Sequence, residues 1–415
     1  MRRSHAVAVS VAAALALTGV GLWLAARATQ PDSTAPNSRP APGQASVPPH
    51  SDVLTLTVTN NSGRSDAVYL YVLGQDLHPG GKLGYVTEEG RFTGWTGGQA
   101  VPAAAPDVAI TGPANGSSKT IKIPRQLSGR MYFAFGRKLD LRLSRAGLVQ
   151  PAPWAAGDPN KDTLFDWSEF TFDDGGLWLN SSQVDQFAVP HVVSVTAPDG
   201  KTSRAGEMVP GGRAKVIKEI RDQPGFEKAV YARPDGTVLR VLAPDKATGA
   251  GLMSPTYLDS YIAEAWNAYR SRTLTVMPFT DQPTIKFTGR TTGDVLSFTD
   301  ASGKKVASFS KPSTSEVWAC DGKLDAPNDK VVGPIARTLC AALNRSTLGR
   351  LDTQPSGTAE DFYQGPQSNH YSRIIHGNMV DHRAYGFAFD DVQNQESLVH
   401  ETDPRLAGIV LSPFN

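Results

Sequence analysis

Apolar and polar residues alternate in short runs along the chain after residue 52. Glycine, proline and asparagine interrupt these runs, and no stretch before residue 205 has the three-to-four spacing of a helix. Short alternating strands between turn residues are typical of a β-sandwich or a barrel. The clearest predicted strands are Leu54–Val58, Val68–Val72, Ile121–Ile123, Met131–Phe135 and Phe165–Phe172.

The pattern changes after Gly212, where helical and strand periods alternate. Ser254 and Pro255 fit the N-cap and first position of a helix that reaches Tyr269. After Leu351 the strand pattern returns. The other elements predicted in this part of the chain are strands at Thr237–Leu242, Asp294–Phe298 and Ala384–Phe389, and a helix at Pro334–Asn344.

The predicted fold class is therefore mainly β with an α/β part. The simplest arrangement is a β-sandwich or barrel domain built from residues 53–205 and 350–415, with a mixed α/β domain inserted at 206–349. About 360 residues is large for a single hydrophobic core, which favours two domains.

The N-terminal residues indicate export. Arg2 and Arg3 precede an uncharged apolar run from Ala6 to Ala26, and the small residues Ala26 and Ala28 have the spacing of a signal-peptidase site. We predict a signal peptide at 1–28 and a proline-rich linker at 29–52. The alternative is that the apolar run stays uncleaved and anchors the protein to the membrane. In either case the remaining chain is expected outside the cell, and the cleaved form has no membrane contact.

Charge and cysteine content restrict the function further. The chain has 41 Lys and Arg against 40 Asp and Glu, and removal of residues 1–28 takes away three arginines and no acid. Because the mature chain is slightly acidic, we expect no nucleic-acid partner. Cys320 and Cys340 are the two cysteines of an exported protein, so we predict one disulfide, with two buried free thiols as the alternative.

Several common catalytic motifs are absent from the sequence. It has no G-x-S-x-G, H-E-x-x-H, C-x-x-C or G-x-G-x-x-G. Histidines and aspartates crowd residues 370–391, but no pair has a metal-ligand spacing on a clear helix. We therefore expect neither a metal nor an organic cofactor.

The segment 165–185 carries the strongest chemical signal. It is predicted to form a hairpin around Asp173-Asp174-Gly175-Gly176, with Trp167, Glu169 and Thr171 on one face by strand alternation. A carboxylate between an indole and a hydroxyl suits work on sugars, because the ring stacks on a pyranose and the acid protonates a glycosidic oxygen. The alternative is a solvated acidic ribbon with the tryptophan packed beneath it.

This segment also carries a family resemblance. Glu169-Phe170-Thr171-Phe172, followed by Ser182-x-Val184-Asp185-x-Phe187-x-Val189-Pro190, resembles the cleft-forming stretch of thaumatin-like proteins. Val58–Asn61 and Ala384–Asp391 resemble other strands of that fold. The closer resemblance, over nearly all of residues 53–415, is to glycoside hydrolase family 64, and it includes Leu339–Leu348 and His370–Ile374.

The resemblance implies endo-hydrolysis of β-1,3-glucan with inversion, in an open groove between a thaumatin-like β domain and an α/β domain. It makes Glu169 the acid and Asp185 the base. The expected product is short laminari-oligosaccharides, and the expected enzyme is a monomer. The alternative function is a non-catalytic glucan-binding thaumatin-like protein. The substrate contacts expected from the resemblance and from the hairpin pattern are Trp167, Thr171, Asp173, Trp178, Asn180 and Ser182.

Strand geometry adds one expectation about the hairpin. If the ribbon stayed regular, Glu169 would face Asn180, and Asp185 would lie roughly 17 Å further along on the opposite face. Two carboxylates so placed could not act on one glycosidic bond, because inversion requires a separation of roughly 6.5 to 9.5 Å. The chain is therefore predicted to leave the ladder near Asn180–Ser182.

Overall fold

The computed structural model describes residues 51–414. The predicted signal peptide and nearly all of the predicted linker lie outside the described residues. Within 51–414 no helix is both long and apolar enough to cross a membrane.

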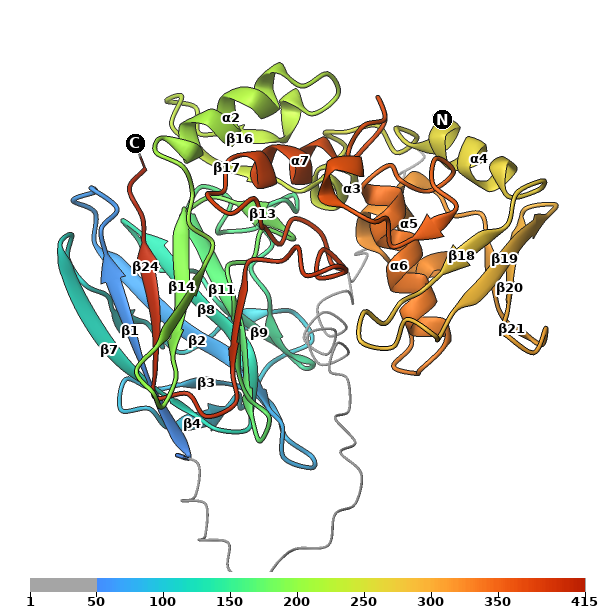
Figure 1. Cartoon of the computed structure of the whole chain (residues 1–415). Coiled ribbons are helices and arrows are strands. Elements are labelled where there is room, and N and C mark those ends of the chain that lie inside the picture. Colours follow the sequence, from blue (N-terminus) through green and yellow to red (C-terminus); the bar gives the residue numbers. More distant parts are fainter. Residues whose placement is uncertain (1–50, 415) are drawn as a thin grey trace, which may run out of the picture.

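Two facing sheets form the β-sandwich seen on the left of Figure 1. The larger sheet has the order β23 (Leu398–Glu401), β12 (Gly176–Asn180), β11 (Leu164–Asp173), β8 (Leu127–Phe135), β2 (Val68–Asp76), β3 (Leu83–Val86) and β4 (Phe92–Gly94), and β6 (Ile110–Thr111) pairs with β2. The smaller sheet has the order β15 (Thr202–Ala205), β14 (His191–Thr196), β24 (Leu406–Leu411), β1 (Val53–Asn60) and β7 (Ser117–Pro124). A short sheet of β10 (Gly147–Val149), β9 (Arg142–Ser144) and β5 (Ala103–Ala104) accompanies them.

The apolar residues predicted for these strands face each other between the two sheets. Val58 of β1, Phe133 of β8 and Phe172 of β11 are almost completely buried in this core. The opposite face of β11 and β8 carries a second aromatic cluster, which includes Tyr132 and Trp167. The predicted absence of helices between 53 and 205 is confirmed. Because its inner face is filled by the sandwich core, the larger sheet can present functional side chains only on its outer face.

The chain between β15 and β23 builds the rest of the molecule. A five-stranded sheet has the order β21 (Lys305–Ser310), β20 (Val295–Thr299), β19 (Phe287–Thr292), β18 (Leu274–Val276) and β22 (Thr353–Gln354). A smaller sheet has the order β13 (Gln186–Phe187), β17 (Val238–Leu242) and β16 (Val230–Ala232). The helices are α2 (Gly212–Asp222), α3 (Pro244–Gly249), α4 (Asp259–Ala268), α5 (Thr314–Ala319), α6 (Val332–Asn344) and α7 (His370–Gly377), with short 3-10 turns at Glu227–Ala229, Gly322–Leu324 and Ala359–Asp361.

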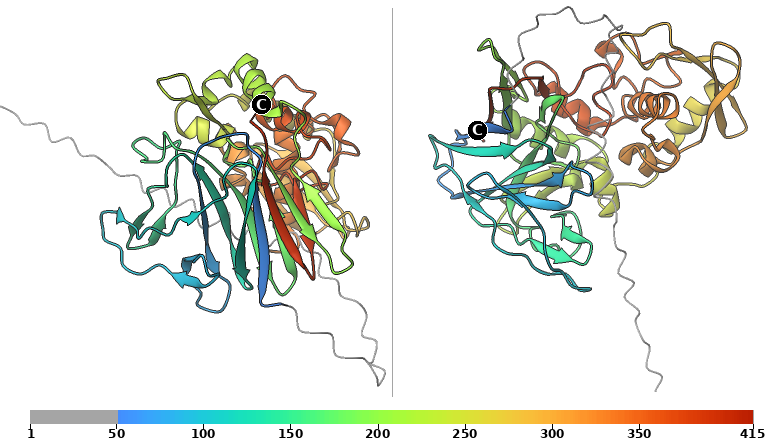
Figure 2. Two further views of the ribbon diagram at one scale, coloured as in Figure 1. Left: turned by 90° about the vertical axis from the view of Figure 1, so that its left-hand side faces the viewer. Right: turned by 90° about the horizontal axis from the view of Figure 1, so that it is seen from below.

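These elements form two further cores. One lies between α4, α6 and the β18–β21 sheet, and the other packs α2 and α7 against β17. Viewed from below, the sandwich and the α6 region lie at opposite sides of the molecule (Figure 2). The last strand, β24, runs parallel to β1 and antiparallel to β14, so the C-terminal segment completes the sandwich. Between 350 and 397 the chain stays with the helical region, because β22 pairs with β18 and α7 contacts α2.

Two predicted elements of the second half differ in the structure. The helix expected to begin at Pro255 begins at Asp259, because residues 255–258 form turns and the Leu258 N–H bonds to the Thr314 hydroxyl at 2.9 Å. The strand expected at Ala384–Phe389 is wrong. Tyr385 makes one isolated bridge and residues 387–390 turn, which buries Phe387 and Phe389 against the α6 core.

Candidate active site

The β11–β12 hairpin has the register predicted from its turn. Glu169 pairs with Asn180, and Thr171 pairs with Trp178. Phe170 and Phe172 point into the sandwich core, whereas Trp167 belongs to the cluster on the outer face. Since neighbouring strand residues point to opposite faces, Glu169 and Thr171 share the outer face with Trp167.

The predicted break in the ladder is also present. Strand β12 ends at Asn180, after which the Ser181 N–H bonds to the Ser397 carbonyl at 3.0 Å and the Gln183 N–H bonds to the Tyr385 carbonyl at 2.9 Å. The next strand, β13, pairs with β17 rather than with β11. This change of partners turns the segment that carries Asp185 back toward Glu169.

Arg130 of β8 connects the two carboxylates. Its Nη2 atom lies 3.0 Å from Oε1 of Glu169 and 3.2 Å from Oδ2 of Asp185, and its Nε atom donates to the same Glu169 oxygen at 3.1 Å. The two carboxylate oxygens are thus no further apart than the sum of two hydrogen-bond lengths. This separation lies below the range of roughly 6.5 to 9.5 Å for an inverting pair and includes the roughly 5 to 5.5 Å of a retaining pair, so both groups can act on one glycosidic bond but their spacing does not by itself select inversion.

Trp167 does not have the position expected of a sugar platform. Its side chain is 1 % exposed, and the guanidinium carbon of Arg130 lies 4.6 Å from the centre of its ring. Tyr132 packs against the indole from the neighbouring strand. The expected sugar contact of Trp167 is therefore wrong in this structure, because the arginine covers the ring face that a pyranose would need. Trp167 supports Arg130 instead.

A second cation reaches Asp185 from the helical region. Nζ of Lys246, in α3, lies 3.3 Å from Oδ1 of Asp185 and 2.7 Å from Oδ2 of Asp245. The side chain of Asp185 is only 5 % exposed, and burial by itself would raise its pKa. Lys246 and Arg130 outweigh that burial and hold the pKa of Asp185 below its ordinary value.

The other expected substrate contacts lie around this pair. Thr171 is buried, and its hydroxyl lies 2.8 Å from that of Ser128. Asn180 is also buried, and its side-chain oxygen has no hydrogen-bond partner in residues 51–414. Ser182, beyond the break, makes an isolated bridge to Tyr385. Asn180 lies directly across the hairpin from Glu169, and Thr171 shares the same face.

Trp178 and Asp173 lie toward the turn of the hairpin. The ring of Trp178 is half-buried and stacks on His400 of β23, with ring centres 4.3 Å apart. Asp173 accepts a hydrogen bond from the Gly175 N–H at 2.9 Å, which fixes the turn. A Cβ atom on Gly175 would come within 2.6 Å of the indole, so the glycine makes room for Trp178.

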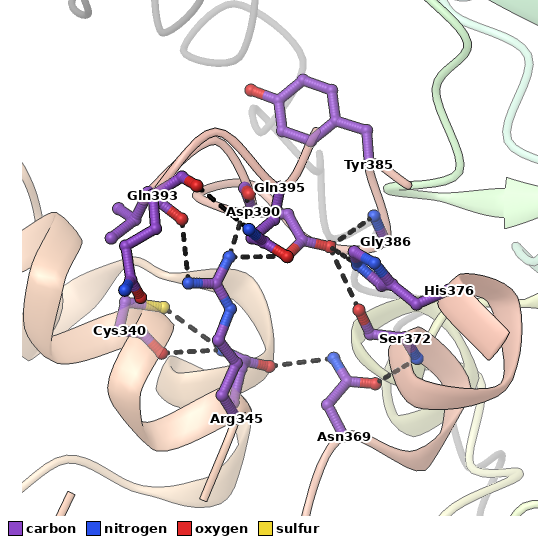
Figure 3. Close-up of polar contacts among 12 residues, drawn as sticks. Cys340, Arg345, Asn369, Ser372, His376, Tyr385, Gly386, Asp390, Gln393 and Gln395 are labelled. Atoms are coloured by element: carbon purple, nitrogen blue, oxygen red, sulfur yellow. Dashed lines mark hydrogen bonds and ion pairs between the residues drawn. The ribbon is translucent and has the colours of Figure 1, made fainter. Parts of the chain in front are cut away.

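A buried polar network holds the loop against which the Asp185 segment rests (Figure 3). The carboxylate of Asp390 is fully buried, accepts hydrogen bonds from Arg345, Ser372 and the Gly386 N–H, and lies 2.8 Å from Nε2 of His376. This network fixes the turn at residues 385–390. The same turn binds Gln183 through the Tyr385 N–H and carbonyl.

Of the histidines and aspartates of the 370–391 stretch, His376 and Asp390 take part in this network, whereas Asp391 pairs with Arg337. No group of three or more His, Cys, Asp or Glu side chains in residues 51–414 is arranged to hold a metal ion. The predicted disulfide between Cys320 and Cys340 is present and joins the end of α5 to α6.

Arg130 and Lys246 were not found from the sequence. Arg130 is the one charged residue in the apolar run Leu127–Phe135, which is a signal that could have drawn attention to it. Lys246 follows a strand whose partner is not apparent from the local pattern, so the sequence contains no comparable signal.

Comparison with known proteins agrees with this geometry. A family model described as β-1,3-glucanase, of glycoside hydrolase family 64, matches residues 52–411. Glucan endo-1,3-β-glucosidases of Arthrobacter sp. (strain YCWD3) and Cellulosimicrobium cellulans are each 42 % identical over 412 residues, which is 99 % of this chain and 71 % of each relative.

Solved structures agree as well. The chain resembles a laminaripentaose-producing β-1,3-glucanase crystallised with laminaritetraose, at 48 % identity and a TM-score of 0.85, over 88 % of this chain and all of that one. A family 64 β-1,3-glucanase domain from Clostridium beijerinckii shares the fold at 24 % identity and a TM-score of 0.72, over 88 % of this chain and all of that one. The family match over nearly the whole described chain and the identity to both curated relatives establish that this protein is an endo-acting β-1,3-glucanase of glycoside hydrolase family 64.

Proposed function

We propose that this glucanase cleaves its substrate with inversion, with Glu169 as the general acid and Asp185 as the general base. The observation that carries the proposal is the pair of contacts from one nitrogen of Arg130 to both carboxylates. Glycosidases of this kind need two carboxyl groups, of which one is protonated and the other ionised. The surroundings of the two groups differ, because Glu169 is the more exposed of the two and Asp185 has two cations beside it.

Glu169 has the properties of the acid. Both contacts of Arg130 go to Oε1, and Oε2 has no hydrogen bond within the described chain. The side chain of Glu169 is 23 % exposed, against 5 % for Asp185. A proton on Oε2 can therefore reach a glycosidic oxygen that approaches from solvent.

Asp185 has the properties of the base. Oδ2 is held by Arg130, whereas Oδ1 is buried and has no aligned hydrogen bond in residues 51–414, although Lys246 is 3.3 Å away. We therefore assign Oδ1 to take the proton of the attacking water, which must enter beside it because the atom is covered in this structure. Two nearby cations keep the carboxylate ionised, which a base requires.

The depth of Asp185 supports inversion rather than retention. A retaining nucleophile must itself reach the anomeric carbon, whereas an inverting base acts through a water molecule. A carboxylate that is 95 % buried and held by two cations is better suited to binding a water than to forming a glycosyl ester. We also propose that sugar units lie in an open groove along the outer face of a thaumatin-like β domain, with Thr171, Asn180 and Trp178 as contacts.

Substitution of each carboxylate tests the assignment. Glu169→Gln and Asp185→Asn are expected to lower the release of reducing ends from laminarin by roughly a hundredfold or more, while the fold is kept. Glu264→Gln, at an exposed position of α4, is the matched control and should retain full activity. Near-normal activity of either site variant would show that its assigned role is wrong.

The stereochemical proposal has a separate test. Proton NMR of the first products should show the α-anomer, because a β-linkage is inverted once. Prompt appearance of the β-anomer would establish retention. Chromatography of the same reaction measures product length, for which we propose short laminari-oligosaccharides, since the 48 % identical glucanase is named for producing laminaripentaose.

We also propose that the enzyme acts outside the cell, on the evidence of the N-terminal sequence and of the disulfide, and its monomeric state stays a prediction. Sequencing the N-terminus of the protein recovered from culture medium tests cleavage near Ala28. Activity that stays with the membrane fraction would favour the uncleaved anchor.

A further inference from the structure

The start of helix α3 lies directly against the segment that carries Asp185. Gln186 of β13 pairs with Leu242 of β17, and the Ala243 N–H donates to the Asp185 carbonyl at 3.0 Å. Helix α3 begins at the next residue, Pro244, which sets the direction of its first turn. Lys246 stands on that turn, and its Nζ atom thereby comes within 3.3 Å of Oδ1 of Asp185.

The surroundings of Lys246 hold the ammonium group in place. Its side chain is 16 % exposed, Asp245 binds the ammonium at 2.7 Å, and the centre of the Trp154 ring lies 5.3 Å from it. Burial lowers the pKa of Lys246, but its two carboxylate neighbours raise it above the ordinary value, so the group is charged at every pH at which the enzyme can work.

We propose that Lys246 is a positioning residue for the general base. It supplies positive charge beside Asp185 through a long contact of 3.3 Å to Oδ1, the oxygen that we assign to take a proton from water. This inference rests on the proposed role of Asp185. It also gives the helical region a part in catalysis, since that region contributes a charge to a carboxylate at the edge of the β domain.

The geometry separates Lys246 from the other cation of the site. Arg130 makes an aligned hydrogen bond to Oδ2, and so consumes acceptor capacity of the carboxylate. The contact from Lys246 to Oδ1 is 3.3 Å long, against 2.7 Å from the same ammonium group to Asp245, so Lys246 holds Oδ1 only weakly. A cation at this distance favours the ionised form of Asp185 and takes up less acceptor capacity than a short hydrogen bond would.

Other charged and titratable groups also face Asp185 and must be kept constant in a test. These are Arg130 and Tyr132 of β8, Glu169 of β11, Asp245 of α3 and Tyr371 of α7. The tyrosines have a raised pKa because they are buried, so they are neutral over the working range. The remaining charges are unchanged by a substitution at Lys246.

The main experiment is the pH profile of kcat/KM on laminarin for Lys246→Met. Methionine keeps the apolar stem but removes the charge, so the acidic limb should move to higher pH by about one unit or more, since an adjacent opposite charge shifts a carboxyl pKa by one to three units. On that limb the variant is then about tenfold slower. Because the base rather than the sugar contact is affected, the loss should appear in kcat and leave KM near normal.

Asp245→Asn is the second variant, and the proposal predicts the opposite sign for it. Removing the Asp245 carboxylate takes a negative charge away from Lys246 and leaves that cation to Asp185 alone. The acidic limb should therefore move to lower pH or stay in place. Because this side chain is 30 % exposed, we expect the variant to fold, which keeps the proposal testable if Lys246→Met does not fold. A purely structural role of Lys246 would slow the variants without moving the acidic limb of Lys246→Met.

Lys218→Met is the matched control, because Lys218 is 78 % exposed on α2 and pairs only with Asp222 among the residues described. It should leave the profile unchanged. An unshifted acidic limb in Lys246→Met, or a shift to higher pH in Asp245→Asn, would overturn the proposal. If Asp185→Asn also retains activity, the fault lies with the proposed function. If Asp185→Asn is inactive, only the role of Lys246 is refuted.

Discussion

Asp166 lies beneath the active site and offers a sharp test of how the Asp185 segment is held. It points into the sandwich from β11 and is 1 % exposed. Its Oδ2 accepts the backbone N–H groups of Ala188 at 2.7 Å and Val189 at 2.9 Å, and its Oδ1 accepts the Trp167 N–H at 3.2 Å. Ala188 and Val189 follow Asp185 closely, so this carboxyl tethers the catalytic segment to β11.

The size of the expected change in unfolding free energy follows from the protonation of Asp166. Burial raises the pKa of Asp166 to about 7, although the three backbone N–H groups act in the opposite direction. An acid with a raised pKa in the folded state contributes stability that is complete below its unfolded pKa and is lost as the pH rises through the folded value. A shift of about three units corresponds to a loss on the order of 4 kcal/mol between pH 4 and pH 7 or above.

The perturbation is Asp166→Asn, which keeps an oxygen for Ala188 and Val189 but cannot ionise. Its amide N–H2 meets the Trp167 N–H, a donor facing a donor, so we expect a pH-independent cost of about 1 to 3 kcal/mol. The variant has this constant cost at every pH, but it does not show the loss of unfolding free energy that the wild type shows as the pH rises. The variant should therefore be clearly less stable at pH 4.5, and the difference should shrink or reverse by pH 7.5.

Denaturant unfolding followed by tryptophan fluorescence, at several pH values between 4.5 and 7.5, measures this difference. Asp174→Asn, at the exposed turn of the hairpin, is the control and should follow the wild type at every pH. Parallel stability curves for wild type and Asp166→Asn would refute the reasoning. They would mean that the backbone N–H groups keep Asp166 ionised in the folded protein despite its burial.

Two further predictions concern substrate binding and the disulfide. Trp178→Ala should raise KM up to about tenfold with little change in kcat, because a stacking ring binds ground state and transition state alike; a fall in kcat at constant KM, measured on laminarin, would contradict this. Replacing Cys320 and Cys340 by serine opens a loop of 20 residues and should cost on the order of 3 kcal/mol of unfolding free energy, seen as a lower Tm with activity at 25 °C retained. An unchanged Tm would show that the crosslink adds nothing to stability.

The sequence by itself determined the local features of this protein. The turn residues Asp174 and Gly175 fixed the register that pairs Glu169 with Asn180, and strand alternation placed Glu169 and Thr171 on one face. The helix near Pro334–Asn344 was evident from its period and is found at Val332–Asn344. Such features depend on neighbours along the chain, and periodicity reports them directly.

Only the tertiary structure decided which groups surround the two carboxylates. Arg130 reaches Asp185 across 55 positions of sequence, and Lys246 reaches it only because β13 pairs with β17. The alternating run Ala384–Phe389 formed a turn instead of a strand, in which Asp390 binds the Gly386 N–H and the α6 core buries Phe387 and Phe389. Trp167 supports Arg130 because the pairing of β11 with β8 places that arginine over its ring. No local pattern in the sequence encodes this order of strands.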